Sequence, residues 1–333
     1  MGRPTRGLRE AHAQQRSPVL ALDIGGTKLA AGVVTAAGEV LSEVSGATDP
    51  SSTPSDVTEA LLDLGNRSAA AAGARVGELE AVGISFGGPV DHGKGVVITC
   101  HHLAGWEGVP LREIVSGRMG LPAAMDNDAN AAALGEAVFG AGRGCSDLIY
   151  ITVSTGIGAG LVVGGKVHRG ANSMAGELGH THLVPYGPKC TCGRLGCLES
   201  VAAGWAIVRE AAAALDMGAE SALRSVPRGE LSAKHVMEMA QTDALAARVV
   251  ARAGEHLGLG IARAVNLLNP EVVAIGGGIS QAGEVLMGPV RRGFARYVMP
   301  ELAEGMRLTT SELAPRWGLL GAAALAVREA TAG

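Results

Sequence analysis

A pattern of short apolar runs that end in glycine opens both halves of the chain. The first half begins with VLALDIGG (19–26), and the second begins with DLIYITVSTGIG (147–158). Each run is typical of a buried strand that enters a tight turn and returns as a second strand, and later segments rich in alanine and leucine favour helices. The repetition predicts an α/β chain with two duplicated lobes, in which ligands bind at strand ends in the cleft between the lobes.

Two helices are predicted with defined ends. The segment 51–75 starts with turn residues and continues with alanine and leucine, so we expect a helix whose N-cap is Ser55. A long apolar helix is expected over 243–270, where Asn269 and Pro270 form its end.

Composition excludes several classes of protein. The 333 residues are enough for two domains, and 47% hydrophobic with 18% charged residues is not the composition of a disordered chain. The net charge of -4 gives no electrostatic reason to expect nucleic acid as a main partner. Residues 1–18 are rich in arginine without an apolar segment, so we expect a loose tail and no signal peptide. No apolar run is long enough for a membrane span, which predicts a soluble, cytoplasmic protein.

Three cysteines and one histidine have the spacing of a metal site. They are His180, Cys190, Cys192 and Cys197. Three thiolates and an imidazole make a closed tetrahedral shell of the structural zinc kind, so the metal would brace the loop that carries Glu177 and Glu199. The alternative is that two of the thiols form a disulfide or stay free, and the lack of a signal peptide argues against the disulfide.

Glycine-rich turns offer backbone N–H groups to an anion. The candidate phosphate-binding residues are Asp23, Gly25, Gly26, Thr27 and Lys28 in the first half and Thr155, Gly156, Gly277 and Gly278 in the second. A single glycine pair between strands is usually only a hairpin turn, but several such turns together could hold a nucleotide. The chain lacks the P-loop motif, and its Gly-x-Gly-x-Gly lacks the dinucleotide spacing.

The segment Asp126–Asn130 is the candidate for chemistry. Aspartate and asparagine are preferred helix N-caps, and an alanine-rich helix is expected to follow, so a purely capping role is one interpretation. The other is that Asp128 lies at a strand-to-helix junction and acts as general base for a hydroxyl in phosphoryl transfer.

Seven motifs together resemble the ROK family of bacterial sugar kinases and sugar-responsive repressors. They are DIGGTK (23–28), GGPVD (87–91), NDAN (127–130), TGIGAGLVVGGKVHRG (155–170), ExGH (177–180), CxCGxxGCxE (190–199) and GGGIS (276–280). The resemblance covers about residues 19–330. It implies the actin-like ATPase (ribonuclease H-like) fold with two lobes, ATP with Mg²⁺, and transfer of the γ-phosphoryl group to the 6-hydroxyl of a hexose. It also implies a homo-oligomer, either a dimer or a tetramer.

Roles carry over from the family by position. The N-terminal lobe would cover 19–127 and be completed by a final helix at 317–330, and the C-terminal lobe would cover 128–316. Asp128 matches the catalytic base. The matches to sugar ligands are Gly88, Asn127, Asp128, Glu177, His180 and Glu199, and the matches to the zinc shell are His180, Cys190, Cys192 and Cys197.

The family also contains repressors, which form the alternative class. Repressors carry an N-terminal winged helix-turn-helix ahead of the first glycine-rich strand. Here 18 residues precede Val19 without apolar helical periodicity, and Asp128 is present as a kinase requires. We therefore expect a kinase that does not bind DNA.

Two positions depart from the family pattern. Gly87 stands where proline is usual, and His102 stands where the glucokinases usually carry an asparagine that touches the sugar. His102 could simply replace the amide as another donor and acceptor. It could instead favour an amino-hexose such as kanosamine, so glucose, an amino-hexose and N-acetylmannosamine all remain candidate substrates.

Overall fold

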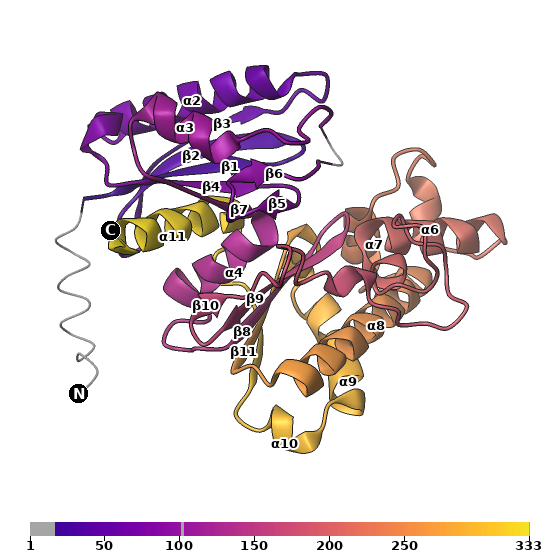
Figure 1. Ribbon diagram of the computed structural model, residues 1–333. Helices are drawn as coiled ribbons and strands as arrows, with labels where there is room; N and C mark the ends of the chain where they lie inside the picture. Colours follow the sequence, from indigo (N-terminus) through magenta and orange to yellow (C-terminus); the bar gives the residue numbers. More distant parts are fainter. Residues whose placement is uncertain (1–16, 101–102, 333) are drawn as a thin grey trace. The chain divides into compact units, whose positions relative to one another are not determined.

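Two five-stranded mixed sheets with the same strand plan form the framework of the protein (Figure 1). The computed structural model describes residues 17–100 and 103–332. These divide into two compact units, of which unit 1 contains the described residues up to Gly144 together with 167–175 and 315–332. Unit 2 contains 145–166 and 176–314. The tail expected at 1–18 lies outside the described residues except for its last two positions.

The sheet of unit 1 has the order β3-β2-β1-β4-β7. Its strands are β1 (Val19–Ile24), β2 (Lys28–Val34), β3 (Val40–Ala47), β4 (Val82–Phe86) and β7 (Ala123–Asn127). The first three strands are antiparallel neighbours, while β4 and β7 join β1 in parallel. A separate short hairpin is formed by β5 (Val90–Asp91) and β6 (Val96–Val97).

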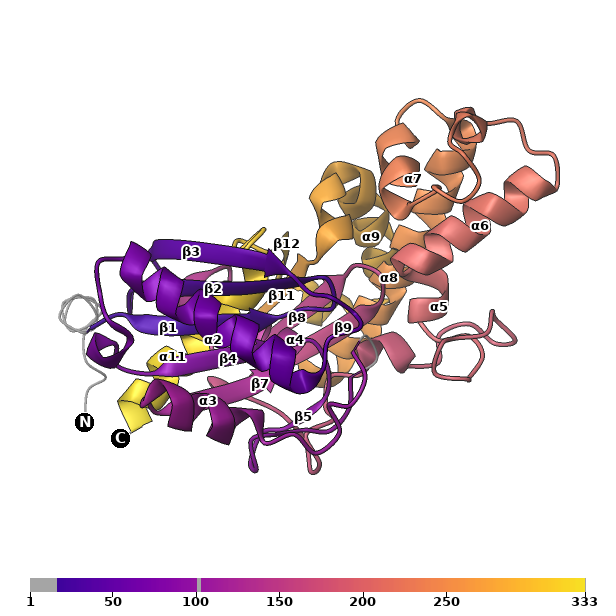
Figure 2. The same ribbon diagram turned by 90° about the horizontal axis from the view of Figure 1, so that it is seen from above.

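Helices cover both faces of this sheet. They are α2 (Pro54–Ala71), the 3-10 turn η1 (Val76–Glu78), α3 (Leu111–Met119), α4 (Asp128–Phe139) and α11 (Trp317–Ala332). Figures 1 and 2 show α2 and α3 along one face, and Figure 1 shows α4 and α11 on the other. Helix α11 packs on β1, β4 and α4, which brings the last helix of the chain into the first unit.

The boundary of unit 1 differs from the expected position at residue 127. Helix α4 belongs to unit 1 because it packs on α11, and a side-chain carbon on Gly321 of α11 would lie 2.5 Å from the Ala131 backbone of α4. The start of α2 also differs from the expectation. Thr53, not Ser55, is its N-cap, because the Thr53 hydroxyl accepts from the Asp56 N–H and the Asp56 carboxylate accepts from the Thr53 N–H.

Unit 2 repeats the strand plan in the order β10-β9-β8-β11-β12. Its strands are β8 (Leu148–Val153), β9 (Ile157–Val163), β10 (Lys166–Val167), β11 (Val272–Gly276) and β12 (Arg307–Thr310). Strands β8 and β9 are antiparallel, and β11 and β12 add in parallel. The duplication expected from the two glycine-terminated runs is therefore present in the topology.

A bundle of helices accompanies the second sheet. The helices are α5 (Glu199–Ala202), α6 (Gly204–Asp216), α7 (Ala233–Met239), α8 (Ala244–Leu268), α9 (Glu284–Tyr297) and α10 (Pro300–Ala303), with 3-10 turns η2 (Leu178–His180), η3 (Ala222–Ser225) and η4 (Gly278–Ala282). Helix α8 packs on α6, α7 and α9. It ends as expected, with Asn269 in the left-handed C-cap conformation before Pro270. Among the described residues, no helix is both long and apolar enough to cross a membrane.

Gly83 tests how closely α11 packs on the first sheet. It lies buried in β4, where a side-chain carbon would overlap the backbone of Ala322 in α11. We expect Gly83→Ala to destabilise the protein by about 1–3 kcal/mol and lower its Tm, because the helix must shift outward. The control is Gly117→Ala in α3, where nothing lies within 4 Å and alanine should stabilise the helix by about 0.5–1 kcal/mol. Equal Tm values for the two variants in thermal melts would contradict this packing.

Candidate functional site

Three of the motifs meet at one edge of the unit 1 sheet. Strands β1, β4 and β7 run in parallel, and the register pairs Ile24 with Phe86 and Phe86 with Asn127 at their carboxyl ends. The chain continues from these ends into DIGGTK, FGGPV and NDAN. Because parallel strands place their carboxyl ends on the same edge, the residues expected to act in catalysis in unit 1 are brought together.

Asn127 and Asp128 form the start of α4 and have different roles there. Asn127 is the N-cap, since its side-chain oxygen accepts from the N–H groups of Ala129 at 3.0 Å and Asn130 at 3.3 Å. Asp128 is the first residue of the helix and is exposed. Its Oδ1 accepts from the Asn127 amide at 2.9 Å and from the Ala129 N–H at 2.8 Å. The capping interpretation therefore holds for Asn127, while the Asp128 carboxylate is oriented at the surface of the strand edge.

A buried ion pair supports this junction, and the sequence analysis did not identify it. The Asp126 side chain is 1% exposed, and its Oδ2 accepts from the guanidinium of Arg169 at 2.7 and 2.6 Å. Its Oδ1 accepts from the Asn130 amide and the Asn127 N–H, both at 2.9 Å. A carboxylate with this many donors is held firmly, and it lies directly before the residues that start α4. Arg169 belongs to the segment TGIGAGLVVGGKVHRG (155–170), but only the fold places it beside Asp126.

The first glycine turn surrounds a carboxylate with an unusual pKa. Burial raises the pKa of Asp23 to about 6, and the negative charge of Asp128 adds to this effect. The turn is closed by a hydrogen bond from the Gly25 N–H to the Lys28 carbonyl at 3.0 Å. Gly26 lies within it, while Thr27 and Lys28 are exposed at its end. The end of β1 and the turn after it therefore bring together a carboxylate, backbone amides, a hydroxyl and an ammonium group.

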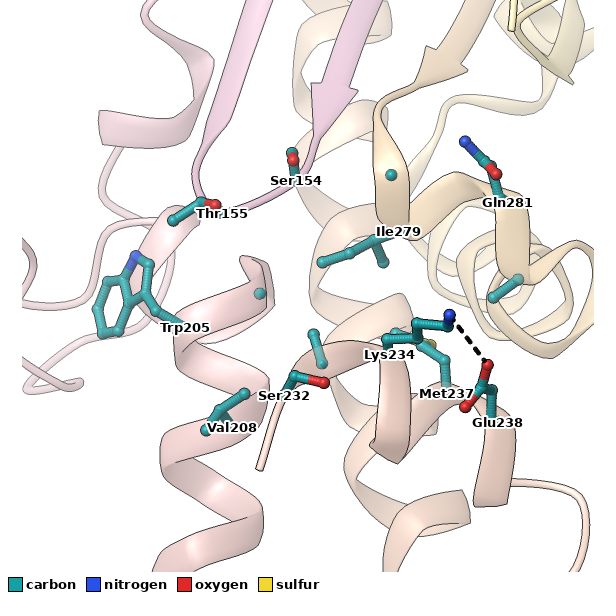
Figure 3. A pocket seen from close by; sticks show the side chains of 14 residues that line it. Ser154, Thr155, Trp205, Val208, Ser232, Lys234, Met237, Glu238, Ile279 and Gln281 are labelled. Atoms are coloured by element: carbon teal, nitrogen blue, oxygen red, sulfur yellow. Dashed lines mark ion pairs between the residues drawn. The ribbon is translucent and has the colours of Figure 1, made fainter. Parts of the chain in front are cut away.

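A cavity of about 730 Å³ lies at the corresponding strand ends of unit 2 (Figure 3). Strands β8 and β11 are parallel, and Thr152 pairs with Gly276 at their ends. Two of the expected nucleotide-binding residues, Thr155 and Gly278, line the cavity. The other two, Gly156 and Gly277, lie beside it in sequence without lining it. At Gly277 a side-chain carbon would overlap the Val153 backbone, so this glycine permits a close approach of the two strand ends.

Several lining residues were not found by sequence reasoning. They are Trp205 and Val208 from α6, Ser232, Lys234, Met237 and Glu238 at α7, and Ile279 and Gln281 from η4. Lys234 and Glu238 form an ion pair at 3.8 Å, the dashed line of Figure 3. No motif joins these residues in the sequence, because they come from three separate elements that only the fold brings together.

The metal-site prediction is supported by the geometry of the cysteine cluster. The ligand atoms of His180, Cys190, Cys192 and Cys197 all lie within 4.8 Å of one another. The Sγ atoms of Cys192 and Cys197 are 3.7 Å apart, which is far longer than the roughly 2 Å of a disulfide bond. Cys190 Sγ lies 3.6 Å from His180 Nδ1.

These distances match a tetrahedral zinc shell. A zinc ion about 2.3 Å from sulfur and about 2.0–2.1 Å from nitrogen would separate two thiolates by about 3.8 Å and a thiolate from an imidazole nitrogen by about 3.6 Å. Burial raises the pKa of the Cys197 thiol to about 12, so a cation would be needed to stabilise its thiolate. A hydrogen bond from the backbone of Arg194 lowers the pKa of Cys192 to about 7. The donor set therefore fits a zinc ion.

His180 and two glutamates flank the cluster. His180 turns Nδ1 toward the cysteines, while its Nε2 lies 3.9 Å from the carboxylate of exposed Glu177. One imidazole can thus serve the metal with one nitrogen and a ligand with the other. Glu199 is 7% exposed, and its oxygens accept from the Thr191 hydroxyl at 2.8 Å and the Ile157 N–H at 3.1 Å. His102, the remaining predicted sugar ligand, lies outside the described residues.

Comparison with known proteins identifies the family. A family model described as the ROK family matches residues 19–329. The chain belongs to the ROK family. The glucokinase of Halalkalibacterium halodurans is 35% identical over 306 residues, which cover 90% of this chain and 92% of that protein. The xylose repressor of Caldicellulosiruptor bescii is 33% identical over 250 residues, which cover 74% of this chain and 62% of the repressor.

Solved structures of ROK proteins have the same fold. The ROK hexokinase of Thermus thermophilus is 38% identical, with a TM-score of 0.81 over 95% of this chain and 100% of that chain. A ROK family glucokinase from Streptomyces griseus, solved in complex with glucose and AMPPNP, is 36% identical with a TM-score of 0.79 over 93% of this chain and 99% of that chain. The duplicated sheets therefore form the actin-like ATPase fold of the ribonuclease H-like class, as expected from the sequence.

The raised pKa of Asp23 predicts a pH-dependent stability. Its folded pKa of about 6 lies above the ordinary value of 3.8, so the folded state binds the proton more tightly and loses stability as pH rises from about 4 to 6. Asp23→Asn removes this penalty. The Tm of the variant relative to wild type should rise across that interval and level off above it, by an amount equivalent to about 2–3 kcal/mol. Thermal melts from pH 4 to 8 measure the difference, with Asp63→Asn on the exposed side of α2 as control. A difference that does not change with pH would contradict the raised pKa.

Proposed function

We propose that this protein is an ATP-dependent hexose kinase that transfers the γ-phosphoryl group to the 6-hydroxyl of its sugar. Membership of the ROK family supports this, as do related proteins named glucokinase and hexokinase. The observation that carries the proposal is the exposed Asp128 carboxylate, which the start of α4 orients at the strand edge that also holds the Asp23 turn. A base placed beside a potential phosphate-binding turn is what phosphoryl transfer to a hydroxyl needs.

Asp128 acts as the general base. Its Oδ1 is held by the Asn127 amide and the Ala129 N–H, which fixes the carboxylate plane relative to the helix. The carboxylate accepts the proton of the 6-hydroxyl as that oxygen attacks the γ-phosphorus of ATP, and the bond from this phosphorus to the bridging oxygen breaks to release ADP. The buried Asp126–Arg169 pair supports the junction from beneath, so the base keeps its orientation when the sugar binds.

Each unit supplies groups suited to sugar hydroxyls. In unit 1 the proposed ligands are Gly88 and Asn127, whose amide already donates to the Gly88 carbonyl at 3.3 Å. In unit 2 they are Glu177, His180 and Glu199. A hexose hydroxyl both donates and accepts, so carboxylates, an amide and an imidazole are complementary to it. Glu199 keeps acceptor capacity because a carboxylate offers about four lone-pair positions.

The nucleotide is ATP, and the unit 2 cavity is its proposed site. The volume of about 730 Å³ lies within the range of small-molecule pockets, and the lining is mainly apolar with a few polar groups. Thr155 and Gly278 at the strand ends offer a hydroxyl and a backbone amide toward phosphate oxygens. Mg²⁺ accompanies ATP and supplies neutralising charge on the phosphates. The Asp23 carboxylate offers oxygen ligands of the kind that Mg²⁺ prefers.

A structural zinc ion held by the cluster of His180 and three cysteines is also part of the proposal. The closed shell of four protein ligands leaves no position for a reacting water, so the metal braces the loop and takes no part in the chemistry. An ion bound to Nδ1 of His180 would orient the imidazole, so that Nε2 faces Glu177 and the sugar. We further propose a homo-oligomer, either a dimer or a tetramer, which light scattering can measure.

A panel of sugars would identify the preferred hexose. Glucose is the first candidate, given the relatives named glucokinase. Kanosamine and N-acetylmannosamine are second candidates, because the His102 imidazole can accept a hydrogen bond from the N–H of an amino or acetamido group. A coupled assay of ADP release compares the kcat/KM values of glucose, mannose, fructose, N-acetylmannosamine, N-acetylglucosamine and amino-glucoses. A repressor role is less well supported, because Asp128 stands at the position of the base that a kinase requires.

Asp128→Asn should lower kcat by about 10²–10⁴-fold, because the amide cannot accept the hydroxyl proton. The sugar should still bind, which calorimetry can verify, since an amide of the same shape keeps most contacts. Asp56→Asn is the matched control: it changes an aspartate in the first turn of α2 of the same unit and should leave kcat unchanged. Near-normal turnover of Asp128→Asn would contradict the catalytic role and leave Asp128 only a structural role at the start of α4.

Purified protein should contain about one zinc ion per chain. Cys192→Ser should lose the metal, melt at a lower temperature and lose activity through displacement of Glu177 and His180. Cys145→Ser changes a cysteine outside the cluster and should keep metal and activity. Metal analysis by mass spectrometry together with thermal melts provides the measurement. Full activity in a preparation free of zinc would rule out the bracing role.

A further inference from the structure

A chain of direct contacts joins the cysteine cluster to the turn after β8. Thr191 stands between Cys190 and Cys192, and its hydroxyl donates to Glu199 Oε1 at 2.8 Å. The other oxygen of Glu199 accepts from the Ile157 N–H at 3.1 Å. Ile157 follows the turn Ser154–Gly156 directly, so one carboxylate is shared by the cluster loop and this turn.

The contact between this carboxylate and the turn is close. A side-chain carbon on Gly156 would lie 2.7 Å from Glu199 Oε2, so a larger residue there would displace the carboxylate. Glu199 is 7% exposed, and a buried carboxylate is costly unless its oxygens are hydrogen-bonded. The position of the turn therefore depends on the donors that hold Glu199 in place.

The segment that begins with Glu199 also holds the turn from its other side. Helix α5 leads into α6, and the Gly204 N–H at the start of α6 donates to the Ser154 carbonyl at 2.9 Å. Gly204, Ser154 and Thr155 all line the 730 Å³ cavity. Ser154 and Thr155 are labelled in Figure 3. The segment 199–204 thus connects the cysteine cluster with the wall of the cavity on which the nucleotide proposal rests.

We propose that Thr191 is a positioning residue for nucleotide binding, acting through Glu199 on the turn Ser154–Gly156. The inference rests on the proposed function, since it assigns the cavity to ATP. It adds that the cluster loop sets the shape of the nucleotide site as well as the positions of Glu177 and His180. Without the Thr191 hydroxyl, Glu199 Oε1 keeps only the weak contact from Cys190 Sγ at 3.7 Å. The carboxylate then shifts toward other partners and releases the turn, so the cavity wall is less well ordered for the nucleotide.

The test measures nucleotide binding without sugar. Thr191→Val keeps the side-chain shape and removes the hydroxyl, while Thr191→Ser keeps the hydroxyl. We expect the Kd for Mg²⁺-AMPPNP, measured by titration calorimetry on the zinc-containing protein, to rise roughly five- to tenfold in Thr191→Val, the size expected for the loss of one typical intramolecular hydrogen bond. Thr191→Ser should stay within about twofold of wild type, and zinc content should be unchanged in both variants.

Thr181→Val is the matched control. Thr181 lies in the neighbouring loop, and its hydroxyl donates to the Leu178 carbonyl at 2.7 Å without a link to Glu199, so nucleotide affinity should be retained. Equal Kd values for wild type and Thr191→Val overturn the inference. Loss of zinc from Thr191→Val together with the affinity also overturns it, because Thr191 would then only stabilise the metal loop. Absence of nucleotide binding by the wild type is a separate result, which contradicts the kinase proposal itself.

Discussion

Parallel strand pairing is the constraint on which the rest of this structure depends. In unit 1, β1, β4 and β7 end at one edge of the sheet, so three glycine-rich or polar turns that are far apart in sequence become neighbours. In unit 2, β8 and β11 end together in the same way, and residues that follow them, among them Thr155 and Gly278, line the cavity. The side chains at these ends are brought together by the hydrogen-bond register of the strands, and no sequence motif has to span them.

Each unit holds a buried carboxylate beside one of the turns of its proposed site. Asp126 lies beneath the start of α4 and is held by Arg169, while Glu199 lies beside the turn after β8 and is held by Thr191 and Ile157. Burial of a carboxylate is costly, and charged or polar donors offset this cost only in a well-defined geometry. Such a group therefore rigidifies the backbone around it, as the proposed base and the proposed phosphate-binding turn would require.

Much of the fold and part of the candidate site could be predicted from the sequence, for physical reasons that particular residues show. Glycine-terminated apolar runs mark buried strands that enter turns, and Asn269 before Pro270 marks a helix end, because these are local effects of the backbone. The closely spaced cysteines predicted a cluster for the same reason. The start of α2 was placed two residues late, since a capping box depends on the reciprocal bonds of Thr53 and Asp56. Arg169 as the partner of Asp126 was missed, because that pairing joins segments 43 residues apart.

The sequence by itself determined the duplicated α/β plan, the residues of the cysteine cluster and the presence of a carboxylate at the start of α4. These follow from residues near one another along the chain, whose spacing and chemistry limit the local structures they can form. Only the tertiary structure decided that α4 belongs with α11, that Trp205, Lys234 and Gln281 share a cavity, and that Thr191 contacts Glu199. The reason is that such contacts arise from the packing of helices on sheets, in which a residue's neighbours are set by register and shape across the whole unit and leave no pattern in the local sequence.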